Sequence, residues 1–176
     1  LSGDAGDDLI DGGVGADQLI GGDGSDTLLG GLENDALWGG EGSDSLAGGA
    51  GDDYLTDSYS VLNNIGNDTL DGGDGNDTID STGGQDVLLG GAGDDDITFY
   101  GVQRLSDATI DGGDGADSIV VWDSKSSDVS GGEGSDSIYV SSTLKSEIDG
   151  GAGDDLITID KTSVSAIAGD TVFGGD

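Results

Sequence analysis

Aspartate is the residue type in this sequence with the most chemistry to offer, and it recurs beside glycine at a fixed spacing. The stretch GGDGNDTIDSTGGQDVLLGGAGDDDIT, residues 72–98, has an aspartate at nearly every third position and glycine pairs at regular intervals. Carboxylate and main-chain carbonyl oxygens are the ligands that hard divalent cations such as calcium prefer. The sequence contains no histidine and no cysteine, which excludes zinc and thiolate sites. The spacing therefore indicates a cation bound by oxygen ligands.

A nine-residue unit organises these aspartates, with the form G-G-x-G-x-D-x-U-x, where U is aliphatic. Nine regular copies begin at residues 12, 21, 39, 48, 72, 90, 112, 131 and 150, and four weaker copies begin at 3, 30, 63 and 81. All thirteen copies keep Leu or Ile at the eighth place and aspartate at the sixth. The sixth-place aspartates are Asp8, Asp17, Asp26, Asp35, Asp44, Asp53, Asp68, Asp77, Asp86, Asp95, Asp117, Asp136 and Asp155. So many copies indicate a repeat architecture.

The unit also predicts the elements that must position the aspartates. Glycines at places one, two and four allow turns with positive φ and let carbonyl oxygens approach an ion. The last three residues, such as 78–80, are expected to form a short strand whose middle side chain points inward. Two units then complete a flattened coil of about 18 residues, and successive coils stack at roughly 4.8 Å. The resulting core is too thin to stabilise the fold alone, so ions must supply the rest.

The unit resembles the calcium-binding nonapeptide repeat of RTX proteins along almost the whole chain. The resemblance implies an all-β fold, a parallel β-roll (a β-solenoid) with two nonapeptides per coil and about nine coils. It also implies that calcium lies between turns on one edge of successive coils, held by the sixth-place aspartates and by main-chain carbonyls. The implied carbonyl ligands belong to Gly13, Gly15, Gly22, Gly24, Gly40, Gly42, Gly49, Gly51, Gly73, Gly75, Gly91, Gly93, Gly113, Gly115, Gly132, Gly134, Gly151 and Gly153.

Alternate turns should lie on opposite edges of the roll. The first edge then carries the units at 3, 21, 39, 63 and 81, and the second edge carries those at 12, 30, 48, 72, 90, 112, 131 and 150 and a truncated GGD at 174. From about residue 99 the spacing between units becomes 22, 19, 19 and 24, close to one whole coil. We therefore expect one continuous solenoid with calcium turns on both edges in residues 1–98 and on one edge only in residues 99–176.

The later half keeps traces of the missing units. Ile110, Val129, Ile148 and Val172 each precede a glycine pair by two residues, the same offset as the eighth-place aliphatics, so these segments read as degenerate nonapeptides. In place of the missing glycine and aspartate pairs, lysine recurs at positions 125, 145 and 161. A lysine ammonium group could partly substitute for the absent cation, or it could be a solvated turn residue.

The charge of the chain predicts different states with and without calcium. The 38 acidic residues and 4 basic residues give a formal charge of −34, which is typical of a disordered acidic segment. Full ladders would hold four ions on the first edge and up to eight on the second, about ten to twelve calcium ions in all, and bring the charge to near −10. We expect a chain that is disordered without calcium and compact with it. Magnesium prefers a small octahedral site with retained water and is the poorer candidate.

The same composition restricts location and partners. Extracellular calcium modules bind at about 10⁻⁴ to 10⁻³ M, so calcium outside a cell would fold the chain and cytosolic levels would not. Proteins that resemble this one generally leave bacteria unfolded, by type I secretion, so a secreted or cell-surface location is expected. Nucleic acid would be repelled, and no apolar run is long enough to insert into a membrane. The first residues, LSGDAGDD, lack the features of a signal peptide.

Several units depart from the pattern. Glu33 replaces the fourth-place glycine of the unit at 30, which predicts a distorted turn or an additional ligand. The units at 3, 63 and 81 replace a glycine of the pair by Asp4, by Asn63 and Asn64, and by Ser81 and Thr82, and their sites are expected to be weaker. Two longer segments, DSYSVL from 57 and FYGVQRLSDATID from 99, should form loops that bulge outward.

No catalytic residue is expected. Paired carboxylates could serve a glycosidase, but every regular aspartate already has a structural role, a flat coil suggests no cleft, and no histidine is available as a base. We therefore expect a calcium-binding scaffold or spacer and not an enzyme. Exposed aromatic residues at 38, 54, 100, 122 and 139 could cover the thin core, stack on a sugar or contact a protein.

Two other classes stay open beside the scaffold. The chain could be an adhesive, filament-forming or surface-layer protein that contacts copies of itself, or an accessory ligand-binding module beside the working domain of an enzyme or toxin. Because Leu1 and the final FGGD lie within the repeat pattern and no polar cap flanks them, we expect part of a longer array with neighbouring domains.

Overall fold

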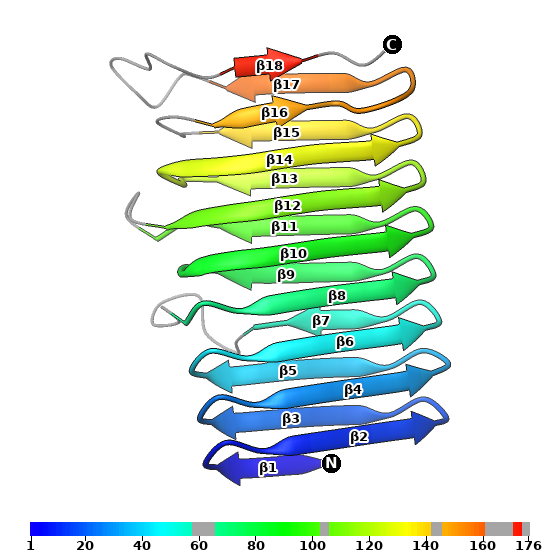
Figure 1. Cartoon of the computed structure of the whole chain (residues 1–176), viewed down its shortest axis with the longest axis vertical. Helices are drawn as coiled ribbons and strands as arrows, with labels where there is room; N and C mark the ends of the chain where they lie inside the picture. The colour runs from blue at the N-terminus through cyan, green and yellow to red at the C-terminus, as the bar shows by residue number, and fades with distance from the viewer. Residues whose placement is uncertain (58–65, 103–105, 142–145, 161–170, 174–176) are drawn as a thin grey trace.

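The chain folds into two stacks of parallel strands wound as one coil (Figure 1). The computed structural model describes residues 1–57, 66–102, 106–141, 146–160 and 171–173. The strands are β1 Ser2–Ala5, β2 Leu9–Val14, β3 Gln18–Asp23, β4 Thr27–Leu32, β5 Ala36–Glu41, β6 Ser45–Ala50, β7 Tyr54–Thr56, β8 Thr69–Asp74, β9 Thr78–Thr82, β10 Gln85–Ala92, β11 Asp96–Tyr100, β12 Asp107–Asp114, β13 Ser118–Trp122, β14 Ser126–Glu133, β15 Ser137–Ser141, β16 Glu147–Asp149, β17 Leu156–Asp160 and β18 Thr171–Phe173.

Odd-numbered and even-numbered strands form separate nine-stranded sheets, the odd sheet and the even sheet. Each strand pairs in parallel with the strand two further along the chain, as β3 does with β5. Two strands therefore make one coil, and the expected all-β parallel roll with two nonapeptides per coil is confirmed. The two nine-stranded sheets form a solenoid of about eight turns, which is close to the nine coils expected. Turns from odd to even strands form the first edge, on the left of Figure 1, and turns from even to odd strands form the second edge, on the right.

Most strands are longer than the three residues expected from the unit; β7, β16 and β18 have three. β3 covers places seven to nine of one unit and continues through the first three places of the next. The glycines belong to the ladder because Gly22 pairs with Gly40 and Gly13 pairs with Gly31. Most glycine pairs therefore continue a strand before the chain turns, although Gly150 and Gly151 follow the end of β16.

The core is a narrow column of aliphatic side chains between the two sheets. The eighth-place residues stack in register, as Leu28 does with Leu46, and most are fully buried. Ile110, Val129 and Ile148 continue this column in the even sheet, and the register extends to residue 172, so the degenerate units keep the predicted offset. A second buried column begins in the later half, with Phe99, Val121 and Val140, against which Ile159 packs.

The irregular segments are only partly described. The segment from residue 57 lies outside the described residues except for Asp57. The segment from residue 99 is shorter than expected, because Phe99 and Tyr100 complete β11 and Asp107 begins β12. No helix that is long and apolar enough to span a membrane is found among the described residues.

Candidate metal sites

The sixth-place aspartates form one ladder along each edge. In each ladder, Oδ1 of an aspartate accepts a hydrogen bond from the backbone N–H of the aspartate one coil earlier. On the first edge the Asp26 N–H donates to Asp44 Oδ1 at 2.8 Å, and on the second edge the Asp77 N–H donates to Asp95 Oδ1 at 2.7 Å. The first-edge ladder runs from Asp8 to Asp86, and the second-edge ladder runs from Asp17 to Asp155. The backbone thus fixes one oxygen of each carboxylate.

The other oxygen, Oδ2, is buried without a hydrogen-bond partner in ten of these aspartates, as far as the described residues show. The ten are Asp8, Asp26, Asp35, Asp44, Asp53, Asp77, Asp95, Asp117, Asp136 and Asp155. Burying a carboxylate oxygen without a partner costs several kcal/mol, so isolated cases are rare in proteins. Ten equivalent cases at ten equivalent places indicate that this oxygen has a partner of another kind.

Main-chain carbonyls line the space beside each Oδ2. A side chain added at Gly30 would meet both Asp35 Oδ2 and the carbonyl oxygen of Gly48, in the next coil, at 2.5 Å. From the other side, the carbonyls of second-place and fourth-place glycines reach toward the next coil, as that of Gly22 does toward Gly40, whose φ is +119°. The gap between successive turns is therefore lined with oxygen atoms, and a glycine at its wall cannot be replaced without filling it.

The first-place carbonyls, such as those of Gly30 and Gly48, were not among the ligands expected from the sequence, although they line the same space as Oδ2. The expected second-place and fourth-place carbonyls reach toward the equivalent glycines of the next coil, as those of Gly22 and Gly24 do toward Gly40 and Gly42. The pattern lets carbonyls at all three glycine places approach an ion, and it does not indicate which of them lies beside Oδ2.

Burial makes these carboxyl groups reluctant to ionise. It raises the pKa of Asp44 and of Asp77 to about 6, and that of Asp95 to about 7. In each case a backbone hydrogen bond opposes the loss of solvation, and neighbouring carboxylates raise the pKa further. Burial also raises the pKa of Asp53, Asp117 and Asp136. A cation in the gap would reverse this effect, because it would favour the charged form.

The residues fit calcium. The gaps offer carboxylate and carbonyl oxygens. The sequence contains no histidine and no cysteine, the residues that usually supply nitrogen and sulfur ligands. Such an all-oxygen set with several neutral donors suits the larger and more flexible coordination of calcium better than that of magnesium.

The fifth-place side chains also link successive turns, but they accept hydrogen bonds from the next coil, whereas the sixth-place aspartates accept them from the preceding coil. At the fifth place, Asn76 Oδ1 accepts from the Asp94 N–H at 2.7 Å, and Asp94 Oδ1 accepts from the Ala116 N–H at 2.9 Å, each one coil later. Sequence reasoning treated the fifth place as variable. Its frequent Asp, Asn and Ser residues were the available signal, since these side chains commonly accept backbone hydrogen bonds in turns.

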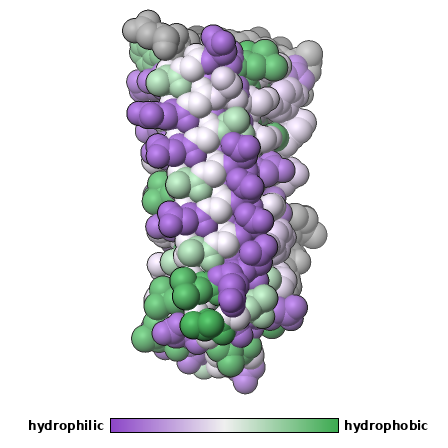
Figure 2. Space-filling view, turned by 90° about the vertical axis from the view of Figure 1, so that its right-hand side faces the viewer, coloured by the Kyte–Doolittle hydropathy of each residue, from purple (hydrophilic) through white to green (hydrophobic). Residues whose placement is uncertain are grey.

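The second edge keeps its character along its length. Figure 2 faces this edge and shows hydrophilic residues running up it beside a paler column, with hydrophobic residues gathered near the lower, N-terminal end. Val14 and Leu32, at the third place of the first two turns, are among the exposed hydrophobic residues.

The first edge changes its residue types along the chain. The residues aligned at the first place in successive coils of this edge are Gly3, Gly21, Gly39, Asp57, Ser81, Phe99, Val121, Val140 and Ile159. At the sixth place it runs through Asp8, Asp26, Asp44, Asp68, Asp86, Ala108, Ser127 and Ser146. Apolar side chains thus replace the glycines, and serine hydroxyls accept the backbone hydrogen bonds that carboxylates accept earlier, as Ser127 does from Ala108 at 3.3 Å.

Three carboxylates meet where this change begins. Oxygens of Asp57, Asp68 and Asp86 all lie within 4.8 Å of one another, and the three side chains are buried. Burial raises the pKa of Asp86 to about 8, while a hydrogen bond from Ser81 opposes the increase. The group could hold a cation. Sequence reasoning missed Asp57 because it was counted as the start of an inserted loop, whereas it occupies the first-glycine place of its coil.

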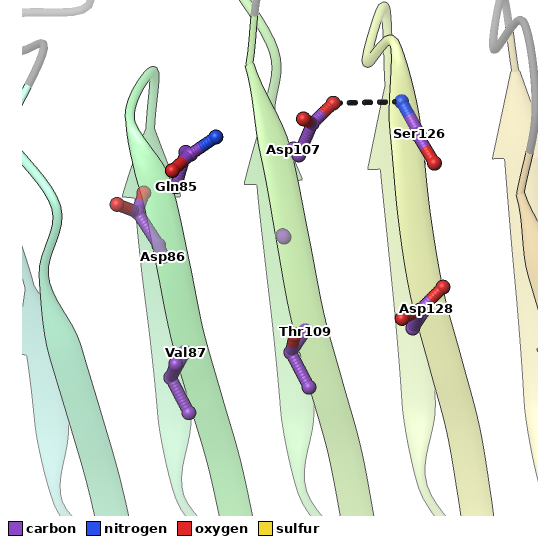
Figure 3. A pocket seen from close by; sticks show the side chains of 8 residues that line it. Gln85, Asp86, Val87, Asp107, Thr109, Ser126 and Asp128 are labelled. Carbon is purple, nitrogen blue, oxygen red and sulfur yellow. Dashed lines mark hydrogen bonds between the residues drawn. The ribbon is translucent and has the colours of Figure 1, made fainter.

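A shallow cavity lies beyond this point, on the outer face of the even sheet (Figure 3). Its volume is about 320 Å³, and its lining includes Asp107, Ala108 and Asp128. Asp107 accepts from the Ser126 N–H at 3.0 Å, and the Lys125 ammonium lies 4.0 Å from the Asp107 carboxylate. With 57% of its side chain exposed, Lys125 is a solvated turn residue rather than a replacement for a buried ion. Residues 145 and 161 lie outside the described residues.

The irregular units keep the turn geometry. Glu33 and Asp4 adopt the left-handed backbone of the glycines that they replace, with φ of 74° and 73°. The expected distortion of the turn at Glu33 does not occur, since β4 and β5 on its two sides stay in register with their neighbours. Residues 63 and 64 lie outside the described residues.

The stacked glycine turns and buried carboxylates define a β-roll of the calcium-binding class. The family model for the RTX calcium-binding nonapeptide repeat (4 copies) matches residues 1–28, 20–55, 63–97, 107–122 and 147–158. Because these matches cover more than half of the sequence, the chain belongs to this family. Comparison with curated proteins finds no match.

Proposed function

We propose that this chain is a non-catalytic structural module that folds on binding calcium outside the cell and then serves as a scaffold or spacer in a secreted or surface-attached bacterial protein. The observation that carries the proposal is the set of ten buried, unpartnered Oδ2 atoms among the described residues, all but that of Asp155 beside a first-place carbonyl of the next coil. The sixth-place aspartates and the glycine carbonyls around each gap would be the ligands. About ten to twelve ions would fill the two ladders, and after about residue 99 only the second edge would hold them.

The charge explains why calcium would act as a folding switch. Stacked carboxylates in each ladder repel one another and are desolvated, which disfavours the roll at neutral pH in the absence of a cation. A ligand that binds only the folded chain stabilises it in proportion to its concentration above the dissociation constant. Millimolar extracellular calcium would therefore favour the roll, and the low calcium inside a cell would leave the chain unfolded and fit for export.

Circular dichroism of the whole chain tests the proposal. In chelator the spectrum should be that of a disordered chain, and calcium should produce β structure where the same concentration of magnesium does little. Asp77→Ala and Asp136→Ala should each raise the calcium concentration at the midpoint about tenfold, because each removes a ladder carboxylate. Asp114→Ala is the matched control, since it removes an equal charge from an exposed third place of a turn. A fully folded chain in chelator would refute the proposal.

A further inference from the structure

The described tryptophans and tyrosines gather on one face of the roll, while the exposed Phe173 lies in the even sheet. Trp38, Tyr54, Tyr100, Trp122 and Tyr139 all belong to the odd sheet, on β5, β7, β11, β13 and β15. Their chain neighbours, such as Leu37 and Val121, point into the core, so the aromatic side chains point outward. Among the described residues, no tryptophan or tyrosine lies in a strand of the even sheet. A need to cover a thin core would apply to both sheets, so this one-sided distribution needs another reason.

Four of these residues form two similar clusters, each with one aspartate. In the first cluster the ring centroids of Trp38 and Tyr54 are 6.1 Å apart with the planes at 58°, and the Tyr54 hydroxyl donates to Asp80 at 3.3 Å. In the second cluster the centroids of Trp122 and Tyr139 are 5.1 Å apart with the planes at 51°. There the Tyr139 hydroxyl donates to Asp160 at 3.2 Å. Both tryptophans of the sequence are used in this way.

The two clusters have the same internal arrangement, with the second displaced by two residues along the strands. Trp38 and Asp80 lie at one level of the sheet on either side of Thr56, and Tyr54 precedes Thr56 by two residues. Trp122 and Asp160 lie at one level on either side of Ser141, and Tyr139 precedes Ser141 by two residues. In both clusters the middle residue is a buried hydroxyl. The repeat unit specifies no residue at the seventh or ninth place, and Trp122 and Asp160 lie two residues beyond the ninth place, where the later coils of the first edge lack glycine. The duplication therefore does not follow from calcium binding.

The arrangement suits a sugar ring. Tyr54 and Trp122 keep 37% and 38% of their surface exposed, so ring surface remains available to stack against the C–H face of a pyranose. The carboxylate beside each ring pair can accept hydrogen bonds from sugar hydroxyls. The clusters lie four strand spacings apart, from β5 to β13, which is about 19 Å along the axis. Two such subsites on one face could bind the same extended chain.

Charge selects the kind of glycan. The formal charge of −34 would repel an acidic polysaccharide, and about ten to twelve bound calcium ions would leave it near −10. A second copy of the chain on this face would bury Asp80 and Asp160 against another acidic surface, with only 4 basic residues in the sequence to pair with them. We propose that the two aromatic clusters are subsites for a neutral polysaccharide that lies along the odd sheet. This role goes beyond calcium-dependent folding.

Binding by the calcium-loaded whole chain tests the inference. The probes are three soluble neutral polysaccharides, mixed-linkage β-glucan, galactomannan and dextran, with alginate as the acidic comparison, in native affinity electrophoresis. At least one neutral probe should retard the chain and alginate should not. Trp38→Ala and Trp122→Ala should each weaken binding about tenfold, and the double variant should lose it. Each single variant keeps one tryptophan, whose fluorescence should still change on binding.

The controls separate this inference from the proposed function. Leu29→Ala, which removes an exposed apolar side chain from the even sheet, should leave binding unchanged, and all variants should fold with calcium as the parent does. Asp80→Asn and Asp160→Asn keep an acceptor oxygen, so they should retain binding within about threefold. The inference is wrong if no neutral probe binds, or if the double variant binds equally well. It is also wrong if this face binds oligolysine and the Asp80→Asn and Asp160→Asn variants lose that binding, because the partner would then be a basic peptide. A tryptophan-dependent self-association in sedimentation velocity would instead identify the face as a contact between copies of the chain.

Discussion

The first edge of the roll changes from one chemistry to another, whereas the second edge keeps its glycines and aspartates in every coil that the structure describes. Up to Asp86 the first edge has glycine at most first places and aspartate at every sixth place; beyond it, Phe99, Val121 and Val140 fill the first places. These three side chains are fully buried. The backbone path is nearly unaffected, because β9, β11 and β13 remain in continuous register. One coil geometry can thus be closed at its edge in two ways, by an ion between oxygens or by apolar packing.

The comparison shows what each way requires of the rest of the chain. A cation gap needs glycine walls and several carbonyls, and it depends on the calcium concentration. An apolar edge needs only a buried side chain and a neutral hydrogen-bond acceptor, which Ser127 and Ser146 provide. Hydrophobic burial contributes at any calcium concentration, so we expect the later half of the first edge to depend on calcium less than the earlier half.

In the absence of calcium, lowering the pH should stabilise the earlier coils more than the later ones. The carboxyl pKa is near 3.8 without burial and about 6 to 8 at Asp44, Asp77, Asp86 and Asp95 in the roll. The folded chain therefore binds more protons between these values, and its stability falls as the pH rises through this window. In chelator, β structure should be greater at pH 5 than at pH 8, as circular dichroism can measure. Hydrogen exchange should place the gain mainly in coils before residue 99. Equal β content at both pH values would contradict this expectation.

Removing the apolar closure should cost stability without changing the metal sites. Phe99→Ala should lower the free energy of unfolding of the calcium-loaded chain by about 3 to 5 kcal/mol, because it leaves a large cavity in a thin core. The number of calcium ions bound per chain, measured by equilibrium dialysis, should be unchanged. Tyr100→Ala, the exposed neighbour on the same strand, is the control and should cost less than about 1 kcal/mol. A loss of bound calcium in Phe99→Ala would instead make the two closures interdependent.

Equivalent sixth places on the first edge should respond differently to the same truncation. Asp44→Ala should raise the calcium concentration at the folding midpoint about tenfold. Ser127→Ala should leave that midpoint unchanged and lower stability in saturating calcium by about 1 kcal/mol, since it removes only a neutral acceptor. Calcium titrations followed by circular dichroism give both quantities. If Ser127→Ala shifted the midpoint as far as Asp44→Ala does, the serine edge would also bind calcium.

The carboxylate group at the transition should give a smaller shift. Asp57→Asn should raise the calcium midpoint about threefold, because it removes one of three charges from the group with Asp68 and Asp86 while keeping its size and polarity. In chelator at pH 8 the same variant should be at least as stable as the parent, since repulsion among buried carboxylates is reduced. A lower midpoint for calcium would exclude Asp57 from the metal sites.

The last expected effect concerns a single strained residue. Glu33 has a φ of 74° where the repeat normally has glycine. Glu33→Gly should stabilise the calcium-loaded roll by about 1 kcal/mol, because glycine adopts this conformation without strain. Thermal unfolding at fixed calcium measures the change. Destabilisation would show instead that the Glu33 carboxylate holds the turn or an ion.

Most of the fold could be predicted from the repeat unit, because its residues act locally. Glycine at fixed places sets the turns, and one aliphatic residue per unit sets the register, so the coils, both sheets and the aspartate ladders followed from spacing alone. The carbonyls of first-place glycines and the hydrogen bonds of fifth-place side chains did not follow, because both depend on the neighbouring coil. Asp57 was missed for a related reason, since its place becomes evident only from the pairing of the preceding Thr56 with Asp80 and from the hydrogen bond that Ser81 donates to Asp57.

The nearest-neighbour contacts between coils have a mechanical consequence. A pull along the axis, applied at one end, would load the terminal coil first and leave the others intact until it detached. The hydrogen bonds from Asp26 to Asp44 span 18 residues, so each such event would release about 60 Å of extended polypeptide. The roll would then lengthen in discrete steps under tension and shorten again as successive coils rewound, with the ambient ion concentration setting the force of each step.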